Sequence, residues 1–341
     1  MNHHRTEGPP TARILGLGAY VPERVMENAE WSEHVDTTDE WIRSRTGIER
    51  RRIAGADETT ATMAVAAARR ALDDAGLGPA DVDEIVVATD TPEVYIPDTA
   101  AFVQHLLGAR EVPAYDLAGS GCAGFVQALD VARSRVIAGQ GRVLVIGVEL
   151  LTRIMDWSDR STAVLFGDAA GAAVVGAGGG GGAGGASGAE IVAAVSGTDG
   201  SRWSILTLEA GGTRLPFHAT TGRGAHDSIV MNGREVFREA VARMSEASRA
   251  VLAKAGATLA DVALVVPHQA NLRIIQAVGQ RLGVAAEKVF VNVQDYGNTG
   301  SASIPLALVQ ARDAGRIRPG DLVLLTSFGA GFHWAAALVR F

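Results

Sequence analysis

Residues 67–86, AARRALDDAGLGPADVDEIV, recur without a gap as residues 247–266, ASRAVLAKAGATLADVALVV, at an offset of 180 residues. Nine positions are identical, and they include the glycines Gly76 and Gly256. Each copy has the pattern of a helix that stops at this glycine, followed by a short loop and an apolar strand. Such a repeat predicts a chain made of two similar halves.

A second repeat lies at an offset of 179 residues and has the same order of helix and strand. Its matching residues are Gly121, Ala128, Leu129, Ala132, Arg133 and Gly141, which recur as Gly300, Ala307, Leu308, Ala311, Arg312 and Gly320. Short apolar runs lie between the helical patterns, at 84–89, 142–147, 264–267 and 321–326. This arrangement favours mixed α/β sheets that are covered on both faces.

The tract from Gly176 to Gly188 consists of Gly, Ala and Ser, and it lies where the first half would pass into the second. Because such a composition cannot bury a core, we expect a surface loop. The tract fits no GxGxxG or Walker pattern between a strand and a helix, so we assign it no nucleotide role. The expected halves are therefore residues 1–180 and 181–341.

The composition is that of a globular protein, with 47% hydrophobic and 20% charged residues among 341. A net charge of −7 argues against nucleic acid as the main partner. The sequence has no apolar run long enough to span a membrane and no apolar leader, so we expect a cytoplasmic protein without a membrane partner. Its single cysteine excludes an internal disulfide and a CxxC zinc pair, and we expect no metal.

That cysteine, Cys122, lies in the sequence AGSGCAGF at 118–125, directly before a helical pattern. Unpaired N–H groups and the helix dipole stabilise a thiolate at such a position, so we expect a lowered pKa and a nucleophilic side chain. The flanking glycines leave room for an acyl group. From position alone, a small buried core cysteine remains an open alternative.

Two polar residues of the second half also lie at the ends of predicted elements. His268 follows the apolar run that ends in Val265-Val266-Pro267, and Asn298 precedes a helical pattern. In the repeat, Cys122 corresponds to Ser301 and His268 to Ala88, so matching positions carry different chemistry. This favours one asymmetric site at the junction of the halves, although a cap or a satisfied polar group remains an alternative for each residue.

Several motifs, spread in order over nearly the whole chain, together resemble one enzyme family. They are Asp39–Ile42, Arg45–Ile48, Cys122–Phe125, Phe166–Asp168, His268–Arg273, Gly297–Thr299 and Phe328–Phe332. The family is ketoacyl-acyl-carrier-protein synthase III, the condensing enzymes of the thiolase superfamily that start fatty-acid chains. The resemblance implies an α/β thiolase-like fold, five-layered α-β-α-β-α, made of two duplicated halves, and a homodimer.

The resemblance also implies roles for the residues at the element ends. Cys122 would take an acyl group from acyl-CoA as a thioester, and no cofactor would be bound permanently. Malonyl carrier protein would then enter and lose carbon dioxide, and His268 and Asn298 would stabilise the enolate that attacks the acyl group. The backbone N–H groups of Cys122 and Ala330 would form the oxyanion hole.

By the same resemblance, Trp41 and Arg160 would hold the adenine of coenzyme A between them, Arg45 would meet its phosphates, and Asn271 would complete the coenzyme site. A flat aromatic face and a guanidinium group suit a purine ring. For the other arginines near Trp41, a solvated basic face is the simpler interpretation.

The resemblance places Phe166 in the acyl pocket and Ile96 at the position that reaches into the partner's acyl pocket. Because Ile96 is smaller than the aromatic residue often found there, it hints at longer or branched primers. Arg238, Arg273 and Arg281 would form a basic surface that attracts an acidic carrier protein. A merely solvated helix face remains the alternative for these arginines.

The chain departs from the family pattern at Ala330, where many members have glycine, and at His333, where a small hydroxyl residue is common. Ala330 keeps its N–H, but its φ must tolerate a Cβ. Degradative thiolases are disfavoured because they need a second cysteine, and elongating ketosynthases because they use two histidines. A polyketide priming ketosynthase or acyltransferase of the same family remains open, as do a cysteine hydrolase and an inactive scaffold.

Overall fold

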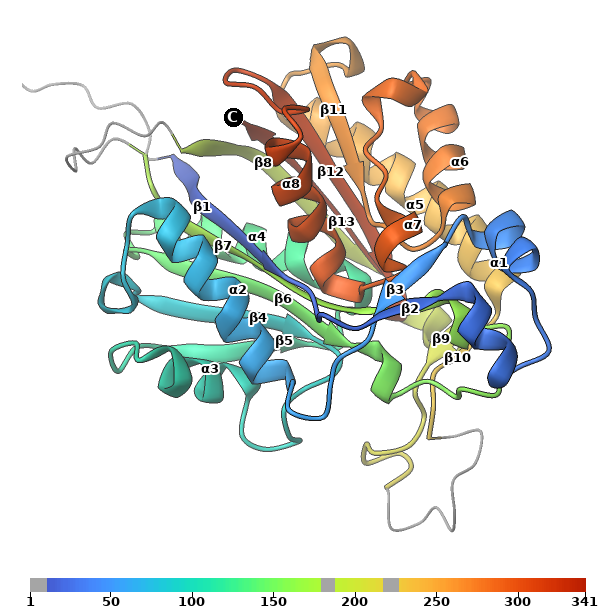
Figure 1. Cartoon of the computed structure of the whole chain (residues 1–341). Helices are drawn as coiled ribbons and strands as arrows, with labels where there is room; N and C mark the ends of the chain where they lie inside the picture. The colour runs from blue at the N-terminus through green and yellow to red at the C-terminus, as the bar shows by residue number, and fades with distance from the viewer. Residues whose placement is uncertain (1–10, 179–187, 217–226) are drawn as a thin grey trace, which may run out of the picture.

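The computed structural model describes residues 11–178, 188–216 and 227–341 (Figure 1). Within them, the strands of the first half lie side by side as one sheet. In spatial order they are β1 (Ala12–Tyr20), β7 (Asp168–Ala177), β6 (Val143–Leu150), β4 (Glu84–Thr89) and β5 (Ala114–Ala118). β4 is parallel to β5 and β6, whereas β7 is antiparallel to β1 and β6.

The second half repeats this order. Its strands are β8 (Ala189–Thr198), β13 (His333–Arg340), β12 (Leu322–Gly329) and β11 (Val262–Pro267). As in the first half, two neighbouring strands, here β12 and β11, are parallel to each other. β13 is antiparallel to both of its neighbours, β8 and β12. β1 and β8 meet through two residue pairs, which joins the halves into a nine-stranded sheet in the described part of the chain.

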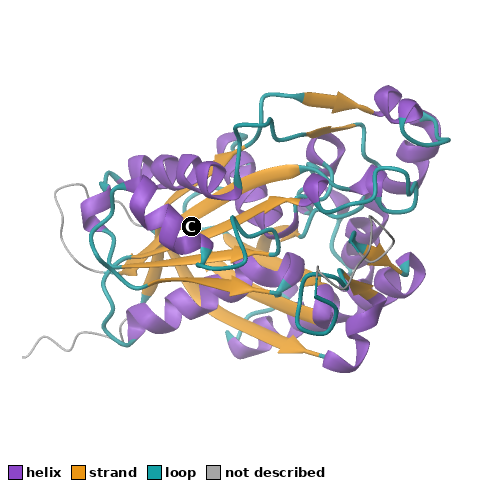
Figure 2. Cartoon of the chain, turned by 90° about the horizontal axis from the view of Figure 1, so that it is seen from below, coloured by secondary structure: helices purple, strands orange, loops and turns teal. Residues whose placement is uncertain are grey.

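Helices cover both halves and fill the space between them (Figures 1 and 2). The outer layer of the first half contains α2 (Thr60–Ala75) and α3 (Thr99–Leu107), and that of the second contains α5 (Gly233–Lys254) and α6 (Leu272–Leu282). The middle layer contains α4 (Gly124–Ile137) and α8 (Ser303–Asp313), whose apolar side chains pack against strands of both halves. The five layers and the duplication predicted by the resemblance are therefore confirmed.

The repeated sequence motifs fold as the pattern predicts. α2 ends at Gly76, with φ 66°, and α5 ends two residues before Gly256, with φ 64°. Only a glycine adopts this left-handed conformation readily, which explains why both copies keep one there. The four predicted strands correspond to β4, β6, β11 and β12 within two or three residues at each end. The boundary at 180/181 and most of the Gly176–Gly188 tract lie outside the described residues.

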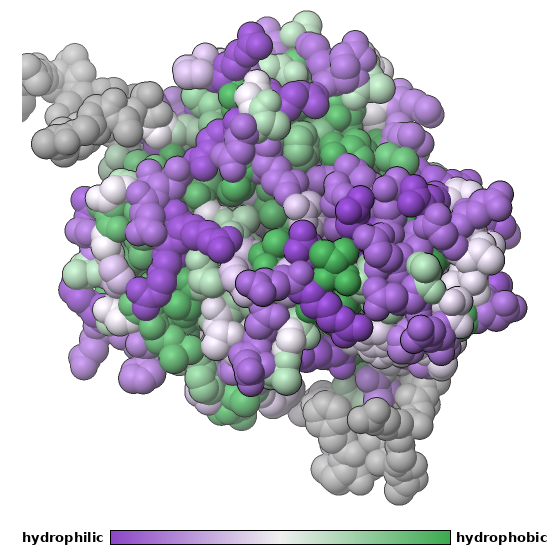
Figure 3. Space-filling view, viewed as in Figure 1, coloured by the Kyte–Doolittle hydropathy of each residue, from purple (hydrophilic) through white to green (hydrophobic). Residues whose placement is uncertain are grey.

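Shorter elements surround the region where the halves meet. They are α1 (Asp39–Thr46), α7 (Val293–Tyr296), β2 (Val25–Glu27), β3 (Arg50–Arg52), β9 (Leu206–Thr207) and β10 (Val230–Met231). In the face drawn in Figure 3 the surface is mostly hydrophilic, and hydrophobic groups gather on the side where Figure 1 places α3. None of the helices that the structure describes is long and apolar enough to cross a membrane.

Candidate active site

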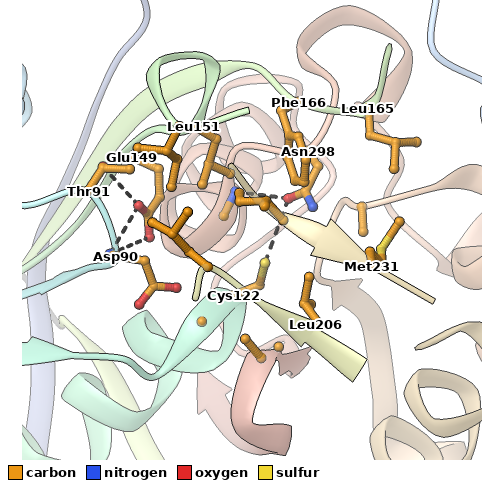
Figure 4. A pocket seen from close by; sticks show the side chains of 18 of the residues that line it. Asp90, Thr91, Cys122, Glu149, Leu151, Leu165, Phe166, Leu206, Met231 and Asn298 are labelled. Carbon is orange, nitrogen blue, oxygen red and sulfur yellow. Dashed lines mark hydrogen bonds between the residues drawn. The ribbon is translucent and has the colours of Figure 1, made fainter. Parts of the chain in front are cut away.

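A cavity of about 1070 Å³ is lined by residues of both halves. Cys122, His268 and Asn298, which are up to 176 positions apart in the sequence, all line it. Figure 4 shows the thiol of Cys122 facing the side chain of Asn298 across this space. The fold therefore brings together the three residues that the sequence singled out.

Cys122 lies in a 3-10 turn, Gly121–Ala123, that leads directly into α4, as the helical pattern predicts. This turn packs backbone to backbone against the loop that follows β12. A Cβ on Gly121 would lie 2.5 Å from the backbone nitrogen of Ala330, and one on Gly329 would lie 2.3 Å from that of Cys122. The two glycines thus permit the close approach of the two proposed oxyanion donors.

Ala330 itself is compatible with its place in this loop. None of the described residues other than glycine has a positive φ, and the left-handed conformation of the loop falls on Gly331, with φ 128°. The Cβ of Ala330 therefore causes no backbone strain, so alanine is tolerated at this position, where many members of the family have glycine.

The electrostatic surroundings of Cys122 contradict the predicted thiolate. Burial raises the pKa of the Cys122 thiol, and the carboxyl groups of Asp90 and Glu149 raise it further. The thiol lies 3.8 Å from Oδ1 of Asn298, and this weak hydrogen bond opposes the rise only in part. The expectation of a lowered pKa is therefore wrong for this resting structure, because burial of the thiol, together with the neighbouring carboxyl groups, outweighs the end of α4.

His268 follows β11 and is held by Ser303, at the start of α8. Its Nδ1 lies 2.6 Å from Oγ of Ser303, and that oxygen also accepts a hydrogen bond from the backbone N–H of Gln269 at 3.4 Å. We assign the hydroxyl of Ser303 as the donor to Nδ1, an arrangement that places the proton of a neutral ring on Nε2. Burial lowers the pKa of His268 to about 3, so the ring is neutral near pH 7.

Asn298 is fixed at its backbone and at its side-chain oxygen. Its backbone N–H donates to Leu165 at 2.7 Å, and its Oδ1 accepts the N–H of Gly300 at 2.9 Å as well as the thiol of Cys122. Because these donors occupy Oδ1, the amide orientation is set and the Nδ2 end is the one that donates into the cavity. Neutral His268 and oriented Asn298 together suit a negatively charged oxygen.

At the mouth of the cavity, the guanidinium carbon of Arg160 lies 4.6 Å from the centre of the Trp41 ring, and that of Arg45 lies 5.6 Å away. Asn271 donates from its side chain to the backbone oxygen of Arg45 at 3.2 Å. The structure thus brings the four predicted coenzyme-site residues together. Arg160 stacks directly on Trp41, so a flat ring can enter between them only if Arg160 moves.

The two predicted acyl-pocket residues lie in different surroundings. Phe166 is buried and lines the cavity together with Leu151, Leu206 and Met231, which form an apolar wall near Cys122 (Figure 4). Ile96 is 82% exposed and does not line this cavity. Its predicted role requires a second subunit.

The predicted docking arginines are all exposed, on two neighbouring helices. Arg238 lies on α5, and Arg273 and Arg281 lie on α6. Arg238 forms an ion pair with Glu239 at 3.3 Å, so part of its charge is neutralised within the protein. The structure places these three side chains at the surface, and their role in docking stays a prediction.

Two sequence profiles match the chain. Residues 115–200 match the family described as 3-oxoacyl-[acyl-carrier-protein (ACP)] synthase III, and residues 252–341 match the C-terminal part of that family. A β-ketoacyl-[acyl-carrier-protein] synthase III of Nitratidesulfovibrio vulgaris is 49% identical over 329 residues, which cover 96% of this chain and 98% of the relative. The chain belongs to the 3-oxoacyl-[acyl-carrier-protein] synthase III family.

Solved structures of the synthase III family resemble this one closely. A β-ketoacyl-[acyl-carrier-protein] synthase III from Thermus thermophilus has a TM-score of 0.87 and 49% identity, covering 96% of this chain and 99% of that chain. The priming β-ketosynthase from the R1128 polyketide biosynthetic pathway has a TM-score of 0.88 and 40% identity, covering 99% of both chains. The expected thiolase-like fold is therefore confirmed.

Sequence reasoning missed two carboxyl groups of the synthase III cavity, those of Asp90 and Glu149 (Figure 4). Asp90 directly follows the predicted strand at 84–89, and Glu149 interrupts the apolar run VLVIGVEL at 143–150. A carboxylate inside an otherwise apolar strand is the signal that could have identified Glu149. Among the described residues, no group of His, Cys, Asp or Glu is arranged to hold a metal ion.

Proposed function

We propose that this chain joins an acyl-CoA primer to malonyl carrier protein with loss of carbon dioxide, forming a 3-ketoacyl carrier protein and so starting fatty-acid synthesis. The observation that carries the proposal is the meeting of Cys122, His268 and Asn298 in one cavity. The high identity to proteins named β-ketoacyl-[acyl-carrier-protein] synthase III supports it.

In the first half-reaction, the sulfur of Cys122 attacks the thioester carbonyl of acyl-CoA. The backbone N–H groups of Cys122 and Ala330 stabilise the negative oxygen of the tetrahedral intermediate. The bond to the coenzyme sulfur then breaks, and that sulfur takes up the proton that the thiol gives up. The products are acyl-Cys122 and free coenzyme A.

In the second half-reaction, malonyl carrier protein loses carbon dioxide and its thioester carbonyl becomes an enolate. Nε2–H of His268 and the side-chain amide of Asn298 donate hydrogen bonds to the enolate oxygen. The enolate carbon attacks acyl-Cys122, the carbon–sulfur bond breaks to release the 3-ketoacyl carrier protein, and the sulfur of Cys122 takes up a proton from solvent. Neutral His268 suits this role in the tautomer in which Ser303 donates to Nδ1 and the single ring proton is on Nε2.

The cavity mouth supports the proposed coenzyme site. Trp41 and Arg160 already stack, and adenine would replace this contact with a stack on each of its faces. Arg45 and Asn271, which share a hydrogen bond, would hold the phosphate end of the coenzyme. The reaction needs no permanently bound cofactor, because acyl-CoA is itself a substrate.

A homodimer in the cytoplasm is part of the proposal. β5 is an edge strand whose residues are half-buried or, at Ala118, exposed, and Val94, Tyr95 and Ile96 are exposed nearby, at 43%, 72% and 82%. An unpaired edge beside exposed apolar side chains favours an interface with a second copy. In such a dimer, Ile96 would reach the partner's acyl pocket beside Phe166. The single cysteine suits a reducing compartment.

The carrier protein is proposed to dock over α5 and α6. Arg238, Arg273 and Arg281 are exposed there, and an acidic carrier protein would be attracted to their charges.

A second candidate function is priming of a polyketide or another secondary product. The 40% identity to the R1128 priming β-ketosynthase favours it. Both functions use the same acylation and condensation steps, so the preferred primer and carrier protein distinguish them. Comparing rates with carrier proteins of the two pathways, each loaded with malonate, decides between them.

Three substitutions test the proposed roles. Cys122→Ser should abolish acylation by acyl-CoA, whereas His268→Ala and Asn298→Ala should still be acylated but lose condensation by about 10²–10³. Acylation is read as a mass increase of the intact protein, and condensation as 3-ketoacyl carrier protein formed. Normal condensation by the Asn298→Ala protein would rule out the assigned enolate role.

A further inference from the structure

β11, which leads directly to His268, pairs in parallel with the segment that leads through α7 to Asn298. In this pairing the backbone N–H of Phe290 donates to the oxygen of Val265 at 2.9 Å. In a parallel ladder the oxygen of Phe290 would next accept the N–H of residue 267. That residue is Pro267, which has no N–H, so the ladder cannot continue in the usual way.

The side-chain amide of Gln269 takes the place of the missing pairing. Its Nε2 donates to the backbone oxygens of Pro267 and Phe290, at 2.8 Å and 3.1 Å. Its Oε1 accepts the backbone N–H of Asn292, the residue before α7, at 2.9 Å. Because two of these partners only accept and the third only donates, they fix the direction in which the amide faces. Gln269 is 1% exposed, so the three hydrogen bonds are sheltered from water.

A further chain of polar side chains connects the start of α7 to its end. Asn292 is buried and donates from its side chain to Oε1 of Gln310, on α8, at 2.8 Å. Nε2 of Gln310 donates in turn to the hydroxyl of Tyr296, the last residue of α7. Asn298 follows two positions later. Both ends of this short helix are therefore held, and Gln269 connects its start to the end of β11.

At the matching place in the first half, the strands pair directly. At the offset of 180 residues, Pro267 corresponds to Val87 and Gln269 to Thr89. There the parallel pairing of β4 with β5 continues to Thr89, which lies opposite Ala118. The proline and the glutamine therefore belong to the half that carries the two proposed enolate donors.

We infer that Gln269 is a positioning residue, which sets the separation of His268 and Asn298 by holding the end of β11 and the start of α7 on opposite sides of its amide. Donors in an active site must be held within about 0.5 Å of their productive positions. Gln269 adjoins one donor in sequence and is bonded to the segment that leads to the other. It does not line the cavity, so it acts through the two donors rather than by touching substrate. The effect on rate rests on the proposed function, whereas the effect on geometry does not.

The first test compares the two half-reactions in the unaltered protein and in Gln269→Met, which keeps a side chain of similar length but removes the amide. Acylation of Cys122, read by intact mass, uses the backbone donors of Cys122 and Ala330, and it should change less than about threefold. Condensation, read as 3-ketoacyl carrier protein formed, should slow about 10–100-fold, because a misplacement of about 1 Å can cost about 10² in rate. A loss of the fold alone would slow both half-reactions.

Gln104→Met is the matched control. The side chain of Gln104, on α3, also donates to two backbone oxygens, those of Ala109 and Arg110, at 2.9 Å and 2.8 Å. Its loss should leave both half-reactions unchanged. Gln310→Met removes the connection at the other end of α7 and should slow condensation selectively, by a smaller factor than Gln269→Met. Because Gln310 is only partly buried, this variant serves if Gln269→Met does not fold.

Two further measurements separate positioning from a general loss of stability. The double variant Gln269→Met with Asn298→Ala should lose less condensation than the product of the two single losses, because both changes act on one pair of donors. A crystal structure of Gln269→Met should show the separation between Nε2 of His268 and Nδ2 of Asn298 changed by more than about 0.5 Å relative to the unaltered protein. This measurement uses no substrate.

Equal slowing of both half-reactions in Gln269→Met, or in Gln310→Met where the first variant does not fold, would overturn the inference. Unchanged condensation in that variant would overturn it too, as would single losses that multiply in the double variant or an unchanged separation of the two donors in the crystal structure. An unaltered protein that forms no 3-ketoacyl carrier protein would count against the proposed function alone, and the separation of the donors would still decide the role of Gln269.

Discussion

Removing the Ser303 hydroxyl should slow condensation while leaving acylation of Cys122 intact. Oγ of Ser303 lies 2.6 Å from Nδ1 of His268, and the two residues are 1% and 4% exposed. With this hydroxyl assigned as the donor to Nδ1, the proton of the neutral ring is on Nε2, the nitrogen proposed to donate to the enolate. In Ser303→Ala, either nitrogen can carry the proton and the ring loses its anchor on α8.

The structure sets the size of two effects of Ser303→Ala, the loss of stability and the slower condensation. Nδ1 of His268 is left buried without its partner, which should cost about 1–3 kcal/mol in the free energy of unfolding. Complete loss of one donor to an oxyanion slows a reaction about 10²–10³-fold, and Ser303→Ala leaves some rings in the productive tautomer. We therefore expect condensation to slow about 10–100-fold, with acylation by acyl-CoA changed less than about threefold.

The assay separates the two half-reactions. Acylation is followed by intact mass after mixing with acyl-CoA, and condensation by the 3-ketoacyl carrier protein formed when the acylated protein meets malonyl carrier protein. Ser248→Ala is the matched control, because Ser248 is also fully buried and donates to the backbone oxygen of Met244 at 2.7 Å rather than to His268. Equal condensation rates in the two variants, or an equal loss of both half-reactions in Ser303→Ala, would mean that Ser303 has no specific role in orienting His268.

Three further predictions follow from the site. Trp41→Ala should raise KM for acyl-CoA about tenfold by removing the ring that stacks with Arg160, and should leave KM for acyl-pantetheine, which lacks adenine, unchanged. The pKa of His268 is about 3 in the folded protein and about 6.5 in the unfolded chain, so the unfolded chain takes up the proton first as the pH is lowered. The free energy of unfolding should therefore fall by about 1.4 kcal/mol for each pH unit below 6.5. Urea unfolding at pH 7, 6 and 5 measures this fall, and His268→Gln should make it smaller. Gly331→Ala should lower the Tm and impair both half-reactions, because its Cβ would lie 2.2 Å from the ring of His333 at a φ of 128°; a Tm equal to that of the unaltered protein would contradict this.

The α/β fold could be predicted because the sequence pattern of helix, glycine and strand occurs in both halves. The helix ends at Gly76 and Gly256 and the strands β4 and β11 follow from local patterns that occur twice. The layer order was not readable from those patterns, since the packing of α4 and α8 between the sheets depends on contacts distant in sequence. It entered through the family resemblance.

The candidate site was predictable in its members but not in its electrostatics. Cys122, His268 and Asn298 could be chosen because each lies at the end of a predicted element, where side chains reach a common edge. The pKa of the thiol depends on its burial and on Asp90 and Glu149, which are distant from Cys122 in sequence and line the same cavity only in the fold. A rule based on the helix end alone therefore gave the wrong sign for the pKa of Cys122.

The predictions that concern exposed residues depend on molecules other than this chain. Nothing within one subunit determines what Ile96 contacts, or whether Arg273 and Arg281 meet a carrier protein. Their exposure is a property of the single chain, and their roles need a second subunit or a docked partner.

Intact-protein mass spectrometry follows both half-reactions at Cys122 in one experiment. The protein is mixed with a panel of acyl-CoA thioesters and then with malonyl carrier protein. We expect an acyl adduct on Cys122 that persists until the malonyl carrier protein arrives and is then converted to 3-ketoacyl carrier protein, with the best acyl donor identifying the primer. An adduct that the malonyl carrier protein leaves unchanged, or no adduct with any acyl-CoA, would show that this chain is not a condensing enzyme of the proposed kind.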